Sequence, residues 1–191
     1  MTRADLRWRL AGLLCLLLAH PAHAFDSLPR VVPAQGTLQA AFAPWDDVEG
    51  LLVGVIDAAR VQILMQAYLL TSKQIAGALI AALRRGVDVR VLADATQSTV
   101  ASAKVGMLAA AGVPIWLETG YQNAHNKVII TDPASPQAAV VTGSFNFTWA
   151  AQHKNAENVL IARNNPVLAA RYLNNWERHL ADATRYQGTR P

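Results

Sequence analysis

Residues 61–117 alternate short apolar runs with longer segments of helical spacing, and this alternation limits the possible folds more than any other feature of the chain. Three runs have the length and β-branched content of buried strands: 61–65, 87–93 and 113–117. Two intervening segments repeat apolar residues every three or four positions and end before a glycine, as helices do: 72–85 and 99–111. This βαβαβ order predicts parallel strands with helices packed on both faces of the sheet.

The flanking segments add strands of a different kind. A strand over 37–43 and a helix over 45–59 are expected before the alternating region. Three short apolar strands and an amphipathic helix are expected after it: 127–131, 138–142, 158–162 and 166–179. Only an Asp-Pro-Ala-Ser-Pro turn separates the first two of these strands, so they should pair as an antiparallel hairpin. The sequence therefore predicts an α/β fold with a mixed central β-sheet and helices on both faces.

Residues 1–24 have the three parts of a Sec-type signal peptide. Three arginines form a basic region, an apolar run follows over 10–19, and Ala22-His23-Ala24 offers small residues for cleavage. The alternative is a buried or membrane-anchoring helix, but the apolar run is short for a bilayer. We expect an exported protein, periplasmic or secreted, without stable membrane insertion after signal cleavage. Residues 25–36 indicate an irregular leader, and 186–191 a polar tail.

Removal of the signal peptide changes the charge and the thiol content of the chain. Three arginines and one aspartate leave with it, so the formal net charge falls from +4 to +2. The single cysteine, Cys15, also leaves, which excludes disulfides and thiol chemistry in the mature protein. A charge of +2 is a weak argument for a polyanionic partner. Any prediction of nucleic-acid binding must therefore rest on a site.

Five residues in two short segments are candidates for such a site. His125 and Lys127 are two positions apart, so on a strand their side chains point to the same face. Ser144 and Asn146 have the same spacing and follow Gly143, which permits a close backbone approach to a ligand. An imidazole, an ammonium group, a hydroxyl and a carboxamide can thus converge on one anion. A phosphate needs this combination, because it requires a nucleophile and donors that neutralise its oxygens.

The strings HNKVIITD and GSFNFTWAAQHKNAEN resemble the HxK(x)4D…GSxN signature of the phospholipase D superfamily, in particular its small single-motif bacterial endonucleases. The resemblance extends over about residues 37–180 and includes the segment RRGVDVRVLAD. It implies a phospholipase D-like α/β sandwich over 37–185 that acts as a metal-independent phosphodiesterase without a cofactor.

The resemblance also implies roles for individual residues. His125 matches the histidine that attacks phosphorus and forms a phosphohistidine, while Lys127, Ser144 and Asn146 match phosphate-binding positions. Glu157 matches the acid that orients the histidine. A carboxylate on one ring nitrogen fixes the tautomer that leaves the other nitrogen free to attack.

Two further motif residues are expected to be structural. Asp132 matches the motif aspartate and should cap the hairpin turn rather than touch the substrate. Gly143 should provide the close approach described above. With no cysteine and three histidines left after export, a zinc site is not expected.

One HxK motif supplies one histidine, whereas the reaction implied by the resemblance uses a nucleophile and an acid. A two-fold homodimer that brings both copies of His125 to one site resolves this. The expected substrate is nucleic acid, DNA or also RNA, contacted through its backbone. The alternatives are a phospholipid headgroup hydrolase and, from another class, a non-catalytic phosphate- or nucleic-acid-binding module.

Other histidines and aromatic residues have simpler interpretations. His153 and His179 lie in polar or helix-terminal contexts and are expected at the solvated surface. Trp116 and Trp176 fall in apolar-periodic segments and are expected in the core. Trp149 directly follows the GSFNFT segment and is a candidate for lining a substrate groove.

Overall fold

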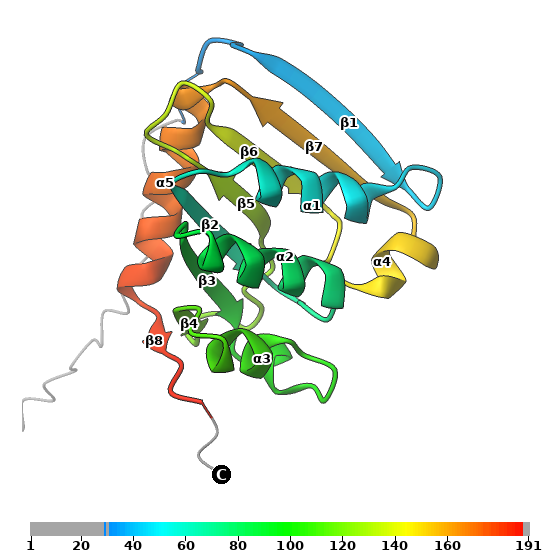
Figure 1. The fold of residues 1–191 in the computed structure, drawn as a ribbon, viewed down its shortest axis with the longest axis vertical. Helices are drawn as coiled ribbons and strands as arrows, with labels where there is room; N and C mark the ends of the chain where they lie inside the picture. The colour runs from blue at the N-terminus through cyan, green and yellow to red at the C-terminus, as the bar shows by residue number, and fades with distance from the viewer. Residues whose placement is uncertain (1–28, 30, 189–191) are drawn as a thin grey trace, which may run out of the picture. The chain divides into compact units, whose positions relative to one another are not determined.

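The structure is a computed structural model that describes residue 29 and residues 31–188 (Figure 1). The predicted signal peptide lies outside the described residues, as do parts of the leader and of the polar tail. The chain divides into two units, and the second, Val32–Pro191, contains every described helix and strand.

Within the described residues, strands form one mixed sheet in the order β1-β7-β6-β5-β2-β3-β4-β8. The strands are β1 (Thr37–Ala43), β2 (Gln62–Ala67), β3 (Asp88–Asp94), β4 (Ile115–Glu118), β5 (Lys127–Thr131), β6 (Ala139–Gly143), β7 (Glu157–Arg163) and β8 (Thr184–Arg185). The β2, β3 and β4 strands are parallel, as their alternation with helices predicts. All other pairings are antiparallel, including the predicted β5–β6 hairpin.

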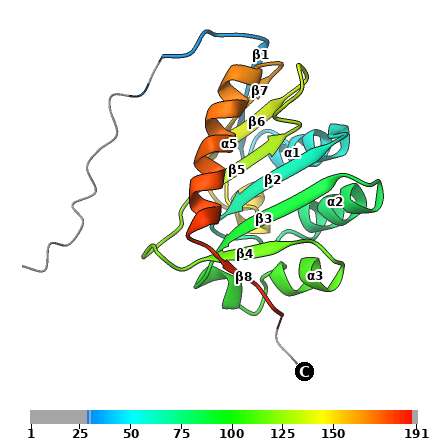
Figure 2. The same ribbon diagram turned by 90° about the vertical axis from the view of Figure 1, so that its left-hand side faces the viewer.

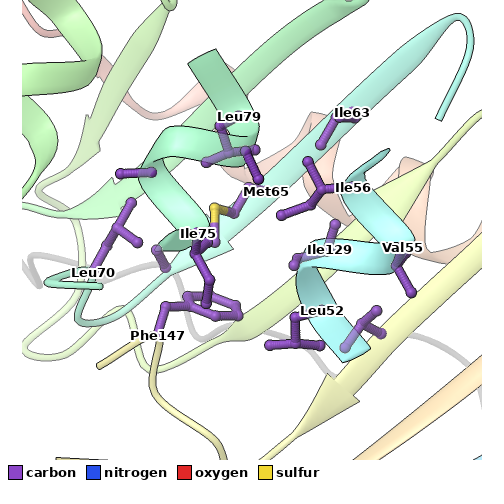
Figure 3. Close-up of a cluster of buried hydrophobic side chains, with 14 of the residues drawn as sticks. Leu52, Val55, Ile56, Ile63, Met65, Leu70, Ile75, Leu79, Ile129 and Phe147 are labelled. Carbon is purple, nitrogen blue, oxygen red and sulfur yellow. The ribbon is translucent and has the colours of Figure 1, made fainter. Parts of the chain in front are cut away.

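Helices cover both faces of this sheet, as Figure 2 shows. The helices are α1 (Val48–Ala58), α2 (Lys73–Arg84), α3 (Val105–Ala110), α4 (Trp149–His153) and α5 (Pro166–Ala181). The α1, α2 and α3 helices pack on one face, and α5 packs on the other. The sheet alternates accordingly: Ile63 and Met65 of β2 belong to the cluster under α1 and α2, whereas Leu64 faces α5. Figure 3 shows the first cluster.

The structure corrects one expectation drawn from the alternating pattern. The helices of the βαβαβ region do not distribute over both faces, because α2 and α3 lie together with α1. Of the described helices, α5 alone covers the second face. The first strand, β1, forms an edge of the sheet and pairs antiparallel with β7.

The helix predicted over 99–111 is shorter than expected. A 3-10 turn, η1 (Gln97–Thr99), precedes α3, which starts only at Val105. The hydroxyls of Ser98 and Thr99 donate to backbone carbonyls three residues earlier, a local bonding pattern that competes with helix formation. The helix predicted over 45–59 likewise begins at Val48, since the Asp47 carboxylate caps it by accepting from Gly50 N.

Two short elements, α4 and β8, were not predicted from the sequence. Each has at most five residues, too few for a periodic pattern to appear. Within the described residues, no helix combines the length and apolar character needed to cross a membrane.

Candidate active site

The predicted site residues gather at one edge of the sheet. At this edge β2 ends at Ala67, and Ala67 pairs with Lys127, the first residue of β5. Gly143 ends β6 and pairs with Val159 of β7, which starts two residues earlier at Glu157. The antiparallel pairing of β6 with β7 therefore brings Glu157 beside Ser144, although the two residues are 13 positions apart in the sequence.

His125 and Lys127 are in direct contact. The Lys127 Nζ atom lies 3.0 Å from His125 Nδ1 and donates to the His125 backbone carbonyl at 2.8 Å. The lysine side chain is buried, while the histidine is exposed. The ring of Tyr68 completes the cluster, with its centroid 4.3 Å from that of His125 and 4.8 Å from Lys127 Nζ. The aromatic face thus supports both the imidazole and the cation.

The environment of Lys127 weakens its hold on its proton. Burial lowers the pKa of Lys127 from 10.5 to about 8, although the negative charge of Glu157 acts in the opposite direction. At neutral pH the group is therefore still an ammonium, close to its titration point.

Ser144 and Glu157 form the second half of the site. Ser144 Oγ donates to Glu157 Oε2 at 2.5 Å and accepts from Asn158 N at 3.0 Å. The other Glu157 oxygen accepts from Asn155 Nδ2 at 2.9 Å. These bonds fix the serine hydroxyl beside a carboxylate at the mouth of the site.

Glu157 does not bond to His125 within the described chain. Its two oxygens are taken by Ser144 and Asn155, and the His125 Nδ1 atom faces Lys127. The role of Glu157 in orienting the attacking histidine therefore stays a prediction.

Asn146 carries an unpaired buried oxygen, and Gly143 lies close to β7. Asn146 Oδ1 is buried and has no hydrogen-bond partner among the described residues. An unpaired buried acceptor is costly, so we expect this amide to gain a donor or to turn when the site is occupied. A Cβ atom on Gly143 would lie 2.2 Å from the Asn158 carbonyl oxygen. Gly143 therefore permits a close approach to β7, and its approach to a ligand stays a prediction.

Asp132 lies at the far end of β5 from Lys127. Its carboxylate accepts from the backbone nitrogens of Arg60, Val61 and Gln62, at 2.7 to 2.9 Å. Its backbone carbonyl accepts from Ser135 N at 2.8 Å, which closes the hairpin turn. Asp132 therefore joins the turn to the start of β2.

Two residues that the sequence analysis did not single out hold the motif in place. Asp94, at the end of β3, is buried and accepts from Ala124 N at 2.8 Å, directly before His125. Burial acts to raise the pKa of Asp94, but hydrogen bonds from Thr96, Gln97 and Ala124 outweigh it and lower the pKa. Tyr68 donates its backbone N–H to the Asn126 carbonyl at 3.0 Å.

The other two histidines within residues 31–188 make their contacts away from His125. His153 is exposed and stacks near Trp149, with ring centroids 4.8 Å apart. The surface position expected for His179 is wrong: this ring is partly buried and its Nδ1 lies 2.5 Å from Oε1 of the buried Glu118. Trp176 is buried as expected, and Trp116 packs against it edge-on.

The described part of the chain, residues 29 and 31–188, contains no group of three or more His, Cys, Asp or Glu side chains placed to hold a metal ion.

Comparison with known proteins identifies the family. The sequence profile described as "Cardiolipin synthase, PLD-like domain" matches residues 52–180. A Rickettsia bellii protein named phospholipase D is 37% identical over 143 residues, which cover 75% of this chain and 69% of that protein. The chain belongs to the phospholipase D superfamily. A mitochondrial cardiolipin hydrolase from mouse is 31% identical over 110 residues, 58% of this chain and 48% of that protein.

Solved structures of other proteins share the fold of this phospholipase D superfamily protein. Nuc from Salmonella typhimurium, a phospholipase D family member, matches with a TM-score of 0.74 and 34% identity over 80% of this chain and 99% of that one. NucT from Helicobacter pylori matches with a TM-score of 0.69 at 20% identity, which supports the fold. With the imidazole, ammonium, hydroxyl and carboxamide at one sheet edge, the superfamily protein is a phosphodiesterase.

Proposed function

We propose that the protein is a metal-independent nuclease that hydrolyses the nucleic-acid backbone through a phosphohistidine, in an active site shared by two chains. The observation that carries this proposal is the contact between the exposed His125 imidazole and the buried Lys127 ammonium at the start of β5. Because the His125 side chain is exposed, the backbone of a polymer can reach it from solvent.

The proposed reaction has two steps. A ring nitrogen of His125 attacks phosphorus, and the bond from phosphorus to the leaving oxygen breaks as a second histidine donates a proton to that oxygen. The second histidine, now neutral, takes a proton from water, whose oxygen attacks phosphorus and releases His125. Lys127 compensates the charge on the phosphoryl oxygens in both steps.

The second histidine is proposed to be His125 of a second chain. Among the described residues, the other histidines are engaged elsewhere: His153 with Trp149 and His179 with Glu118. A two-fold dimer would supply the missing imidazole and a second lysine. Two ammonium groups would favour a phosphodiester anion even though the net charge is small.

A phospholipid headgroup hydrolase is the second candidate, because the relatives include proteins named phospholipase D and mitochondrial cardiolipin hydrolase. The likeness to Nuc over almost the whole of that chain supports the nuclease.

Purified protein incubated with plasmid DNA, RNA and phosphatidylcholine vesicles separates the two candidates. We expect cleavage of nucleic acid and no headgroup release, with a matched His125→Ala sample as the blank. Headgroup release without nucleic-acid cleavage would refute the nuclease. The N-terminus of the same preparation tests for export, because a periplasmic or secreted protein should lack residues 1–24.

A further inference from the structure

Trp149, the first residue of α4, presents a large aromatic surface to solvent. The side chain is 58% exposed, and two basic side chains that follow it in the sequence lie beside it. The His153 ring lies one helical turn later with its centroid 4.8 Å from that of Trp149, and Lys154 Nζ lies 5.7 Å from the indole centroid. An exposed aromatic face next to cations is the combination that binds an unpaired base together with its phosphates.

The α4 helix is fixed relative to the catalytic residues. Gln152 is buried and spans from α4 to the start of α1, donating to Asp46 O at 2.8 Å and accepting from Glu49 N at 2.9 Å. Thr148 caps α4 by accepting from Ala151 N at 3.1 Å.

The preceding residue, Phe147, is also tied to the site. It donates to Leu69 O at 3.1 Å and accepts from Thr71 N and Ser72 N at 2.9 Å. These partners of Phe147 directly follow Tyr68, whose ring contacts His125. The backbone before Trp149 is therefore anchored to the segment next to Tyr68, so the indole needs little ordering on binding.

A second exposed tryptophan has the opposite electrostatic surroundings. Trp45 is 83% exposed, but Asp46 and Asp47 follow it directly. Two carboxylates would repel a phosphate backbone at this position. Among residues 29 and 31–188, two tryptophan side chains are thus largely exposed, and of these Trp149 lies beside basic side chains whereas Trp45 lies beside carboxylates.

We propose that Trp149, with His153 and Lys154, is a stacking platform for an unpaired base of the nucleic-acid strand whose phosphate lies at His125. The proposal rests on the nuclease function proposed above and extends it, because a platform that needs a free base face favours single-stranded over double-stranded substrate. Lys154 and His153 would contact a phosphate next to the stacked base.

Binding can be measured without cleavage in the His125→Ala background. Fluorescence anisotropy of a labelled oligothymidylate should show affinity weakened roughly 5- to 150-fold by adding Trp149→Ala. Adding Trp45→Ala should leave the affinity unchanged, and Trp149→Phe should restore most of it. Lys154→Ala should lower the slope of log affinity against log salt by about 0.7.

Each alternative has its own signature. Equal losses for Trp149→Ala and Trp45→Ala, or no loss for Trp149→Ala, would overturn the platform. The platform would also be overturned if Trp149→Ala reduced binding to phosphatidylcholine vesicles and not to the oligothymidylate. Dissociation of a dimer by Trp149→Ala in sedimentation would overturn it as well. Failure of the wild type to cleave any nucleic acid would instead refute the nuclease function, which the binding assay does not depend on.

Discussion

The Lys127 ammonium nitrogen lies 3.0 Å from Nδ1 of His125, so the two motif residues contact each other in the absence of substrate. An ammonium group can only donate, which leaves Nδ1 as the acceptor and places the proton of a neutral ring on Nε2. In this arrangement the Nε2 atom cannot attack. A phosphate that draws Lys127 toward its oxygens would release Nδ1 and permit the other tautomer. The substrate anion would thus help to activate its own nucleophile.

His125→Ala should abolish turnover while leaving the fold intact, because the side chain is exposed and its removal creates no cavity. Loss of covalent catalysis should cost several kcal/mol in activation free energy, which corresponds to less than about a hundredth of the wild-type rate. Steady-state cleavage assays and circular dichroism test this. A folded variant above that rate would contradict the assignment of His125 as nucleophile.

The pH dependence of kcat/KM should reflect Lys127. Because the pKa of Lys127 is lowered to about 8, the ammonium needed for phosphate is lost as pH rises through that value. We expect kcat/KM to fall about tenfold per pH unit above pH 8. A profile that is flat up to pH 10 would show that the charge of Lys127 is not required.

The same pKa shift predicts an opposite trend in stability. Between pH 8 and 10.5 the unfolded chain binds a proton at Lys127 that the folded chain does not, so the free energy of unfolding rises with pH. Urea titrations of the wild type and of Lys127→Met across this window isolate the effect. The wild type should gain stability relative to Lys127→Met, because methionine does not titrate.

Chelation provides an independent test of the phosphohistidine route. The proposed steps use imidazole and ammonium groups, so cleavage should continue in excess EDTA at an unchanged rate. Loss of activity on chelation, with recovery on adding a metal, would require a different mechanism.

Motif residues and most strands were predictable from the sequence, because each depends on neighbours a few positions away. The β5 strand occupies the predicted range, and His125 contacts Lys127 although it lies in the loop before β5 and not on the strand. Tyr68 was not predictable, since it is 57 residues from His125 and reaches it through the antiparallel pairing of β2 with β5. The Glu118–His179 pair was missed for the same reason.

Gly143 and Gly77 offer a matched test of the packing between β6 and β7. Gly143→Ala would place a methyl group 2.2 Å from the Asn158 carbonyl oxygen, so the strands must separate. We expect a loss of about 1–3 kcal/mol of stability and a loss of activity, since Ser144 and Glu157 would move apart. Gly77 lies in α2 with no atom near its missing Cβ, so Gly77→Ala should stabilise by up to about 1 kcal/mol. Thermal unfolding of both variants distinguishes these outcomes, and equal effects would contradict the steric argument.

The shared active site predicts a dominant-negative effect. Two copies of His125 would serve one phosphate, one as nucleophile and one as acid, so a dimer with a single intact histidine should be impaired. Wild-type chains mixed with an excess of His125→Ala chains, under conditions that permit exchange, should lose more activity than dilution explains.

Sedimentation of the same mixture at assay concentration should show a dimer. The control is an equal excess of Gly77→Ala chains, which keep the catalytic residues and should add activity rather than suppress it. A fully active monomer would contradict the shared site, because the proton for the leaving group would then have to come from within one chain. Glu157 would be the first group to test in that case, since it is the carboxylate whose charge acts on Lys127.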